Sequence, residues 1–412
     1  MEKTLFNNEI QNMKNYIMFE IKARQNELTP MLKAKNRAPI ALSMGAPVDR
    51  VPEFAIKKAI EYLDIDSLHT YSTPKGEPKF LEGVSTYMKN RFNVEIDPKK
   101  QAVSLIGSKE GLSNLIRALV NPSEIEKEQD VILTPAPGYA SYSQMIRIAG
   151  ARAYEIPLTK ENDFQPDLEG ILEEYIARGN DPKKIKALII NYPNNPLGCT
   201  CDKKYLQHCV DFCNELGILL ISDNAYCEMY FDESYKPHSA LECKGAMDCC
   251  IEMYSFSKSY AMTGWRLGWA CGNELAVTML SRMKSTVDTG IFKVLQNVGA
   301  DLLSGDEGQK YIDNQNIKFK SKIQKFVDGL NSLGYDVKMP KATFYLWIEI
   351  PARYKNCEEF ASDMLEKSGI VIVPGTAFDK NATRYCRLSV VESDEKLAEV
   401  IKRMKEDGFQ FE

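Results

Sequence analysis

Short apolar segments alternate with amphipathic ones along the middle of the chain. Apolar runs that predict buried strands occupy residues 102–106, 131–133, 185–190, 218–221 and 249–253. Helical spacing predicts helices over about 109–120, after Tyr139, and over about 202–216. Strands separated by helices indicate right-handed crossovers and a mainly parallel sheet covered on both faces. We therefore expect a ligand site at the carboxyl ends of these strands.

The pattern changes after about residue 296. A long polar helix is expected over about 308–333 and another near Glu358, with strands at 335–338, 343–348, 371–373 and 385–390. This order is typical of an α+β domain. The 412 residues also exceed the ~250–300 at which a single core stops growing. We predict a large domain over 47–296 and a small domain formed by 1–46 together with 297–412.

The N-terminal region is expected to belong to the small domain and to carry no export signal. Helical spacing between Ile10 and Ile21 predicts a helix that packs onto that domain. Glu2, Glu9 and Glu20 stand among lysines, without the uninterrupted apolar core of a secretory signal. No apolar run approaches the ~20 residues that a membrane-spanning helix needs. These features predict a cytoplasmic protein without a membrane partner.

Charge and cysteine content narrow the class of protein further. The net charge of −5 leaves no basic excess to neutralise phosphates, so nucleic acid is not expected as a partner. Eleven cysteines, an odd number in a long chain, indicate buried reduced thiols rather than a disulfide framework. The three histidines are not spaced to complete a zinc site, so no metal site is predicted.

Residue types that bind phosphate cluster in the stretch 254–268, directly after the strand at 249–253. A lysine in a dry pocket beside other cations loses proton affinity and becomes a nucleophile toward an aldehyde, and Lys258 could be this residue. Ser255 and Arg266 flank it as hydroxyl and guanidinium donors for a phosphate. Taken alone, the stretch is equally compatible with a surface loop and a solvated lysine.

A second polar segment follows the strand at 218–221. Asp223 could hold a pyridine nitrogen protonated, which lets the ring accept electrons from a substrate carbanion. Tyr226 could donate its phenol to the 3-oxygen of the same ring. An aspartate at a strand end is more often a helix cap or a turn residue. It is the combination of this segment with the Lys258 segment that favours a cofactor site.

The order of these motifs resembles the class I/II, fold-type I aminotransferases. Asp-x-x-Tyr is followed about thirty residues later by Ser-x-x-Lys and a trailing Gly-Trp-Arg, and the similarity runs from about residue 40 to 400. The resemblance implies an α/β fold, with a mainly parallel seven-stranded sheet between helices and a smaller α+β domain. It also implies ping-pong transfer of an amino group from an amino acid to a 2-oxo acid, with pyridoxal 5'-phosphate held as a Schiff base on Lys258. The closest branch is the bacterial one that contains LL-diaminopimelate and related aspartate- or alanine-handling enzymes.

The same resemblance extends to other cofactor contacts. It implies that Ser108 and Lys109 offer backbone N–H groups to the phosphate at a helix start. Tyr139, after Pro137-Gly138, would stack on the cofactor ring. Asn195 would bond the 3-oxygen of the cofactor. Tyr71 would reach across a dimer interface to the phosphate of the neighbouring subunit, which implies a homodimer.

Substrate contacts also follow from the resemblance. Gly45 lies in a Gly-x-Pro loop that would cover the substrate carboxylate, which Asn195 would also bond. Arg387 would grip this α-carboxylate in a bidentate fork. Members specific for dicarboxylates often carry a distal arginine near the stretch that holds Asp288, and residues 286–294 contain none. A preference for aspartate is therefore not expected.

Two other functions stay open at this stage. A carbon–sulfur β-lyase uses the same cofactor and the same lysine, but it needs no 2-oxo acid. A non-catalytic, aminotransferase-like binding domain is the weaker alternative, because Lys258, Asp223, Tyr226 and Arg387 are all retained and no basic module precedes residue 40. The sequence Asp288-Thr-Gly290 resembles an aspartic-protease motif, but that site needs two carboxylates and no second copy is found.

Overall fold

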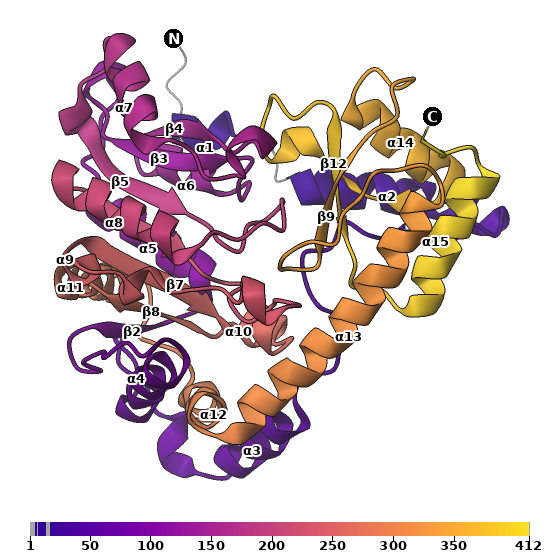
Figure 1. Ribbon diagram of the computed structural model, residues 1–412. Helices are drawn as coiled ribbons and strands as arrows, with labels where there is room; N and C mark the ends of the chain where they lie inside the picture. Colours follow the sequence, from indigo (N-terminus) through magenta and orange to yellow (C-terminus); the bar gives the residue numbers. More distant parts are fainter. Residues whose placement is uncertain (1–4, 6, 14–16, 412) are drawn as a thin grey trace.

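Two lobes, each built on its own β-sheet, make up the computed structural model, which describes residues 5, 7–13 and 17–411. Helix α13 (Asp306–Asn331) runs from one lobe to the other (Figure 1). The domain boundaries expected near residues 46 and 296 stay a prediction. Residues 1–4, 6, 14–16 and 412 of the expected small domain lie outside the described residues.

The first lobe contains a seven-stranded sheet. Its strands, in spatial order, are β2 (Ala102–Leu105), β8 (Gly268–Gly272), β7 (Cys250–Ser255), β6 (Leu219–Asp223), β5 (Ile185–Ile190), β3 (Val131–Ala136) and β4 (Arg152–Pro157). Only β8 runs antiparallel to its neighbours. The mainly parallel sheet predicted from the sequence is thus confirmed. The pattern missed β4, a largely half-buried edge strand without a clear apolar run, and β8, a short strand that begins and ends with glycine.

Helices cover both faces of this sheet because successive side chains of each strand point to opposite sides. Ile251 and Met253 pack in one apolar cluster, whereas Cys250 and Tyr254 of the same strand pack in another. The first cluster includes residues of α5 (Ser108–Leu119), α6 (Tyr142–Ile148) and α11 (Glu274–Lys284). The second includes residues of α3 (Glu53–Leu63), α4 (Pro78–Phe92), α7 (Leu168–Ala177), α8 (Lys203–Leu216), α9 (Ala246–Cys249) and α12 (Lys293–Ser304).

Local sequence signals set the ends of α8, which the sequence predicts over about 202–216. The Asp202 carboxylate accepts the backbone N–H of Tyr205 (2.7 Å) and caps the first turn. Gly217, with φ of +64°, ends the helix in the left-handed conformation that glycine adopts at low cost. Because of these two signals, the predicted bounds of this helix agree closely with the observed ones.

The second lobe contains a three-stranded antiparallel sheet in the order β11 (Val373–Pro374), β12 (Tyr385–Ser389) and β9 (Tyr345–Glu349). Its apolar cluster includes side chains of α13, α14 (Cys357–Ser368) and α15 (Asp394–Glu406). A separate parallel pair joins β1 (Ile40–Ala41) to β10 (Ile370–Val371). The single strand expected at 371–373 is therefore divided between two sheets, because its two halves pair with different partners.

The strand expected at 335–338 is wrong, because this stretch is not part of any sheet. Its alternation of Tyr335 and Val337 still fits burial, and both side chains are buried. The backbone N–H and C=O of Val337, however, bond the side chain of Asn331 (2.9 Å each). A side chain has taken the hydrogen bonds that a neighbouring strand would provide.

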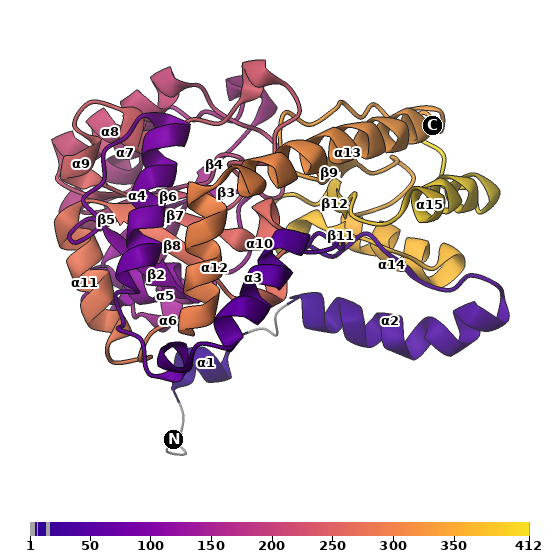
Figure 2. The same cartoon turned by 90° about the horizontal axis from the view of Figure 1, so that it is seen from below.

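The N-terminal helices divide between the two lobes. α2 (Ile17–Ala34) packs against α14, with Leu32 in a cluster with Leu365 and Val371 (Figure 2). The expected packing on the small domain is confirmed for this helix. It is wrong for α1 (Asn8–Gln11), which contacts α6 of the first lobe through an ion pair of Glu9 with Arg147 (2.7 Å).

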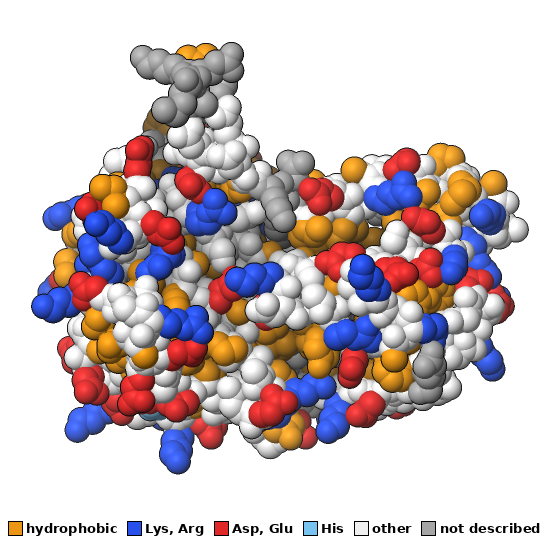
Figure 3. Space-filling view, turned by 90° about the horizontal axis from the view of Figure 1, so that it is seen from above, with side chains coloured by type: hydrophobic (Ala, Val, Ile, Leu, Met, Phe, Trp, Pro, Cys, Tyr) orange, Lys and Arg blue, Asp and Glu red, His pale blue; other side chains and the backbone are white. Residues whose placement is uncertain are grey.

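The remaining elements are short. They are α10 (Phe256–Ser259) and the 3₁₀ turns η1 (Asp66–His69), η2 (Glu126–Glu128), η3 (Lys160–Asn162), η4 (Pro182–Lys184), η5 (Glu233–Tyr235), η6 (Ala240–Glu242), η7 (Thr263–Trp265) and η8 (Gly375–Ala377). Among the described residues, no helix combines the length and the apolar character needed to cross a membrane. On the face seen in Figure 3, acidic and basic side chains are interspersed.

All eleven cysteines lie within the described residues and carry free thiols. Ten are buried and Cys201 is partly buried. The prediction of buried reduced thiols is confirmed. Burial raises the pKa of most of these thiols, including Cys243 and Cys249 to about 11.

Candidate active site

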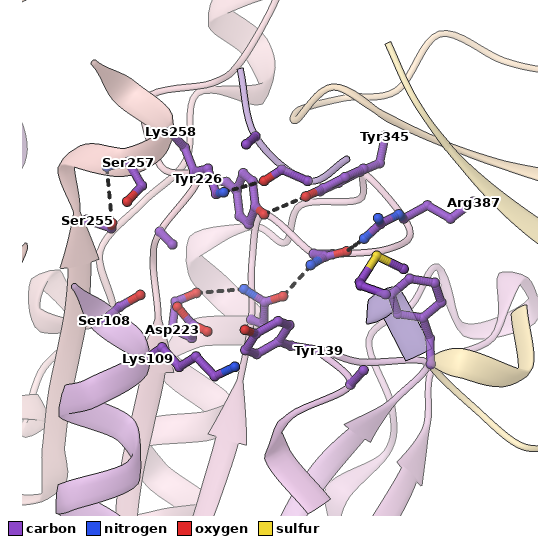
Figure 4. A pocket seen from close by; sticks show the side chains of 18 of the residues that line it. Ser108, Lys109, Tyr139, Asp223, Tyr226, Ser255, Ser257, Lys258, Tyr345 and Arg387 are labelled. Atoms are coloured by element: carbon purple, nitrogen blue, oxygen red, sulfur yellow. Dashed lines mark hydrogen bonds between the residues drawn. The ribbon is translucent and has the colours of Figure 1, made fainter. Parts of the chain in front are cut away.

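A cavity of about 350 Å³ opens at the carboxyl ends of the parallel strands (Figure 4). Most residues that the sequence assigns to the site line it: Gly45, Ser108, Lys109, Tyr139, Asn195, Asp223, Tyr226, Ser255, Lys258, Arg266 and Arg387. Tyr71 does not line it, and 86% of its side-chain surface is exposed. The structure thus brings together eleven of the twelve predicted residues within one chain.

Strand order explains why residues so far apart in sequence meet here. Asp223 and Ser255 are the last residues of β6 and β7, and Asn191 directly follows β5. Ser108 begins α5 after β2, which runs in the same direction. The carboxyl ends of parallel strands share one edge of a sheet, so their terminal side chains converge there.

Lys258 lies in α10, one turn after the end of β7. Its Nζ donates a hydrogen bond to the carbonyl oxygen of Gly45. The pKa of Lys258 is lowered to about 8, mainly by burial and also by the positive charges of Arg387 and Arg266, whereas Asp223 opposes the shift. A substantial fraction of this amine is therefore neutral near pH 8, and a neutral amine can attack an aldehyde.

Asp223 is a buried carboxylate with one unused oxygen. Oδ2 accepts a hydrogen bond from the hydroxyl of Tyr142 (2.6 Å), whereas Oδ1 is buried and has no hydrogen-bond partner among the residues that the structure describes. Burial raises the pKa of this carboxyl above its usual range, although the Tyr142 bond lowers it. A buried acceptor of this kind calls for a donor. The N–H of a protonated pyridine ring would supply one, so the residue fits the ring of the predicted cofactor.

A group of phosphate-binding donors surrounds the start of α5. Ser255, Ser257 and Arg266 line the cavity beside Ser108. The first N–H groups of a helix have no acceptor within the helix, and they lie at its positive end. Gly107 precedes this turn with φ of +79°, and an added Cβ there would collide with the guanidinium of Arg266. This arrangement suits a phosphate dianion.

Arg387 lies on β12 of the second lobe and reaches into the same cavity. Its Nη1 donates to Asn195 Oδ1 (2.9 Å) and its Nη2 to the carbonyl oxygen of Ser43 (2.8 Å). Its Nε is buried without a partner. The guanidinium carbon lies 4.4 Å from the ring centre of Tyr345 and 4.7 Å from that of Phe378. A carboxylate of a substrate would complete the hydrogen bonding of this buried cation.

Two tyrosines connect the lobes across the cavity. The hydroxyl groups of Tyr226 and Tyr345 lie 2.8 Å apart, and the rings pack edge to face. The ring of Tyr139 packs edge to face against Tyr142 (5.5 Å between centres), and Lys109 Nζ lies 5.8 Å from the Tyr139 ring centre. Burial raises the pKa of Tyr226, so its phenol stays protonated and can donate a hydrogen bond.

Several lining residues were not predicted. Tyr345 belongs to the strand expected at 343–348, and Asn191 and Ser257 lie close in sequence to the predicted residues Asn195 and Lys258, so a sequence signal existed for them. Asn191 donates to the carbonyl oxygen of Asp223 (2.8 Å) and accepts the N–H of Asn195 (2.9 Å), which holds both in place. Ile17, Met18, Ala46, Ala140, Ala225 and Phe378 also line the cavity, and they carry no chemical signal.

Comparisons with known proteins agree over nearly the whole chain. The sequence profile of the family described as aminotransferase class I and II matches residues 37–404. The chain is 38% identical over 396 residues to an LL-diaminopimelate aminotransferase of Desulforudis audaxviator, covering 96% of each protein. It is 35% identical over 402 residues to a protein of the same name from Halothermothrix orenii, covering 98% of each. A substrate-bound structure of BacF from Bacillus subtilis superimposes with a TM-score of 0.91 at 30% identity, covering 100% of this chain and 99% of that one.

Proposed function

This chain belongs to the class I and II aminotransferases, and we propose that the cavity around Lys258 is its active site. It is a pyridoxal-phosphate enzyme that transfers an amino group from an amino acid to a 2-oxo acid. Its relatives carry the name of aminotransferases, which favours this reaction over a carbon–sulfur lyase or a non-catalytic domain. The fold is fold type I, as the sequence resemblance implied.

The unpartnered Oδ1 of Asp223, in the same cavity as Lys258, is the observation that carries the proposal. When bound, pyridoxal phosphate supplies an aldehyde that takes up the amino group and a ring that accepts electrons from the substrate Cα. Asp223 would hold the ring nitrogen protonated through Oδ1, which has no hydrogen-bond partner among the described residues. Tyr226 and Asn195, which line the cavity, would donate to the 3-oxygen, and Tyr139 would pack against the ring.

Lys258 acts twice in this proposal. Its neutral amine is the nucleophile that attaches the cofactor, because burial and two arginines hold its pKa to about 8. With a substrate bound, its Nζ would be the base that removes the proton from the substrate Cα. Arg387 and the backbone around Gly45 orient the α-carboxylate of the substrate, so that the Cα proton faces the lysine.

The phosphate of the cofactor has a separate set of contacts in this proposal. Ser108 and Lys109 contribute the start of α5, and Ser255 and Arg266 contribute side-chain donors. Tyr71 of a second subunit completes the set, since this residue is 86% exposed and does not line the cavity of its own chain. We therefore propose a homodimer.

Substrate and compartment are also proposals. The names of the relatives make LL-diaminopimelate the first amino donor to test. A half-reaction screen of amino acids, read from cofactor absorbance, would identify the donor without a coupled assay. The eleven free thiols support a reducing compartment, and we propose the cytoplasm.

Substitution Lys258→Ala tests the assignment of the site. Turnover is expected to fall by at least the ~10²–10⁴-fold that one positioned proton-transfer group contributes. Borohydride should then no longer fix the cofactor to the chain, as measured by mass spectrometry. Lys325→Ala, which removes an exposed lysine paired with Asp394, is the control and should retain both properties. Turnover of Lys258→Ala near the wild-type rate would refute the proposal, and pyruvate release without any 2-oxo acid would favour a lyase.

A further inference from the structure

A buried ion cluster lies outside the cavity, at the end of α11. The side chain of Lys284 is fully buried, and its Nζ lies 3.2 Å from each carboxylate oxygen of Glu110. It lies 3.0 Å from Oδ2 of Asp288. None of the three residues lines the cavity. Such clusters are weak evidence for stability, because desolvation offsets much of the attraction, so another role must be considered.

Glu110 connects the cluster to the loop before α5. It is the third residue of this helix, and its Oε2 accepts the backbone N–H of Ile106 (3.0 Å). Arg266 Nη2 donates to the carbonyl oxygen of the same residue (3.1 Å). Ile106 is thus held from both sides. Gly107 and Ser108 follow it directly, so these two hydrogen bonds of Ile106 fix the direction of the first N–H groups of α5.

Charge explains why Glu110 needs a buried cation. A carboxylate in the first turn of α5 has the same sign as a phosphate bound at that turn, and the two would repel each other. Lys284 contacts both oxygens of the carboxylate and offsets part of this charge, although it also pairs with Asp288. Glu110 can then hold Ile106 and weaken anion binding less.

Asp288 connects the cluster to a second segment. Its Oδ1 accepts the backbone N–H of Gly290 (2.8 Å). Gly290 has φ of +97°, and an added Cβ would collide with the carbonyl of Thr73 and press on Ser72. These two residues directly follow Tyr71. The motif Asp288-Thr-Gly290 therefore connects the ion cluster, which adjoins the Ile106–Ser108 loop, with the segment that carries Tyr71.

We propose that Lys284 is a positioning residue for the cofactor phosphate. It offsets the charge of Glu110, which holds the Ile106–Ser108 loop, and it pairs with Asp288, which bonds Gly290 where that residue packs against the Tyr71 segment. This inference rests on the proposed function, because it requires that a phosphate binds at the start of α5. It assigns a role to residues that do not touch the cofactor.

The test compares two ligands of the apoprotein, pyridoxal phosphate and pyridoxal, which lacks the phosphate. In Lys284→Met, the dissociation constant for pyridoxal phosphate should rise at least about tenfold, whereas that for pyridoxal should change by less than about twofold. Both constants come from absorbance titrations. The double variant Lys284→Met/Glu110→Gln should recover part of the affinity for pyridoxal phosphate, because it removes the carboxylate in the first turn of α5 and leaves only Asp288 without its lysine.

Asp288→Asn provides a second variant if Lys284→Met fails to fold. It keeps an oxygen for Gly290 but removes one negative partner of Lys284, so Lys284 is left to Glu110 alone; binding of pyridoxal phosphate should tighten, and binding of pyridoxal should not change. Asp130→Asn is the matched control. Asp130 is buried, lies 3.7 Å from Lys186 and accepts the N–H of Asn121 (2.8 Å), but it precedes β3 at the opposite end of the sheet. It should lower the unfolding temperature of the apoprotein and leave the ratio of the two affinities unchanged.

The outcomes separate the two proposals. If wild-type apoprotein binds pyridoxal phosphate no more tightly than pyridoxal, the proposed phosphate site is wrong. If the wild type discriminates but Lys284→Met and Asp288→Asn keep the wild-type ratio, as Asp130→Asn should, the cluster is purely structural and the role assigned to Lys284 is overturned. Equal weakening of both ligands would overturn it as well.

Discussion

At Lys258, three neighbours act on one amine in different directions. Burial penalises its charged form, and the two arginines add repulsion, whereas Asp223 attracts the charge. The balance lowers the pKa from the ordinary lysine value of 10.5 to about 8. The amine therefore loses its proton as the pH rises through about 8, whereas a lysine with the ordinary pKa loses it near pH 10.5. Lys258 is thus partly neutral, and able to act as a nucleophile, at pH values where a lysine with the ordinary pKa is charged.

The rate at which apoprotein captures added pyridoxal phosphate should therefore depend on pH. We expect the rate to rise with pH and to level off above about 8, because only the neutral amine reacts. Stopped-flow absorbance at a series of pH values measures this midpoint. The variant Arg387→Gln should shift the midpoint upward, because Arg387 lowers the pKa of Lys258 more than Arg266 does. A midpoint near 10.5 in the wild type would contradict the proposed environment of the amine.

At the scale of elements, the start of α5 depends on one glycine. Gly107 has φ of +79° and ψ of 155°, a conformation that residues with a side chain rarely adopt. The space beside it is filled by the guanidinium of Arg266. Glycine is therefore favoured at position 107 for two reasons: the backbone has a positive φ, and the guanidinium of Arg266 leaves no room for a Cβ.

Gly107→Ala should cost about 1–3 kcal/mol of unfolding free energy and should also displace Arg266. We expect weaker binding of pyridoxal phosphate, measured by titration, together with a lower denaturation midpoint. Gly217→Ala is the control, because Gly217 also has positive φ (+64°) but has no atom within 4 Å of the added Cβ. It should lose stability and keep its cofactor affinity. Equal affinities in the two variants would argue against a phosphate contact of this loop.

At the scale of the whole molecule, the question is whether one chain forms a complete site or whether a second chain contributes Tyr71, which is exposed in its own chain. If each site combines Lys258 of one subunit with Tyr71 of the other, two defective variants can complement each other. A hybrid of Lys258→Ala and Tyr71→Ala has one site with both wild-type residues and one site with neither.

Mixing these two variants by denaturation and refolding should restore about a quarter of the wild-type activity, because about half of the dimers are hybrids with one intact site each. The measurement is turnover of the mixture against each variant refolded alone. Lys258→Ala mixed with itself is the control and should stay inactive. Absence of recovery, with hybrid dimers detected by native mass spectrometry, would place Tyr71 outside the site.

The sequence by itself determined the parallel sheet and most of the site. Asp223, Ser255 and Lys258 stand at or just after strand ends, and in a parallel sheet those ends share an edge, so local pattern alone predicted that they meet. The family resemblance added Gly45, Asn195 and Arg387, which no local pattern could join to them. Tyr71 remains a prediction that a single chain does not test.

Only the tertiary structure decided the features that depend on long-range contacts. The Tyr142 bond to Asp223, the Tyr226–Tyr345 contact and the pKa of Lys258 each arise from residues far apart in the chain. The stretch 335–338 alternates like a strand, but Asn331 supplies its hydrogen bonds instead. Periodicity reports which side chains are buried, whereas the partner of a backbone or a charge is set by what the rest of the fold brings beside it.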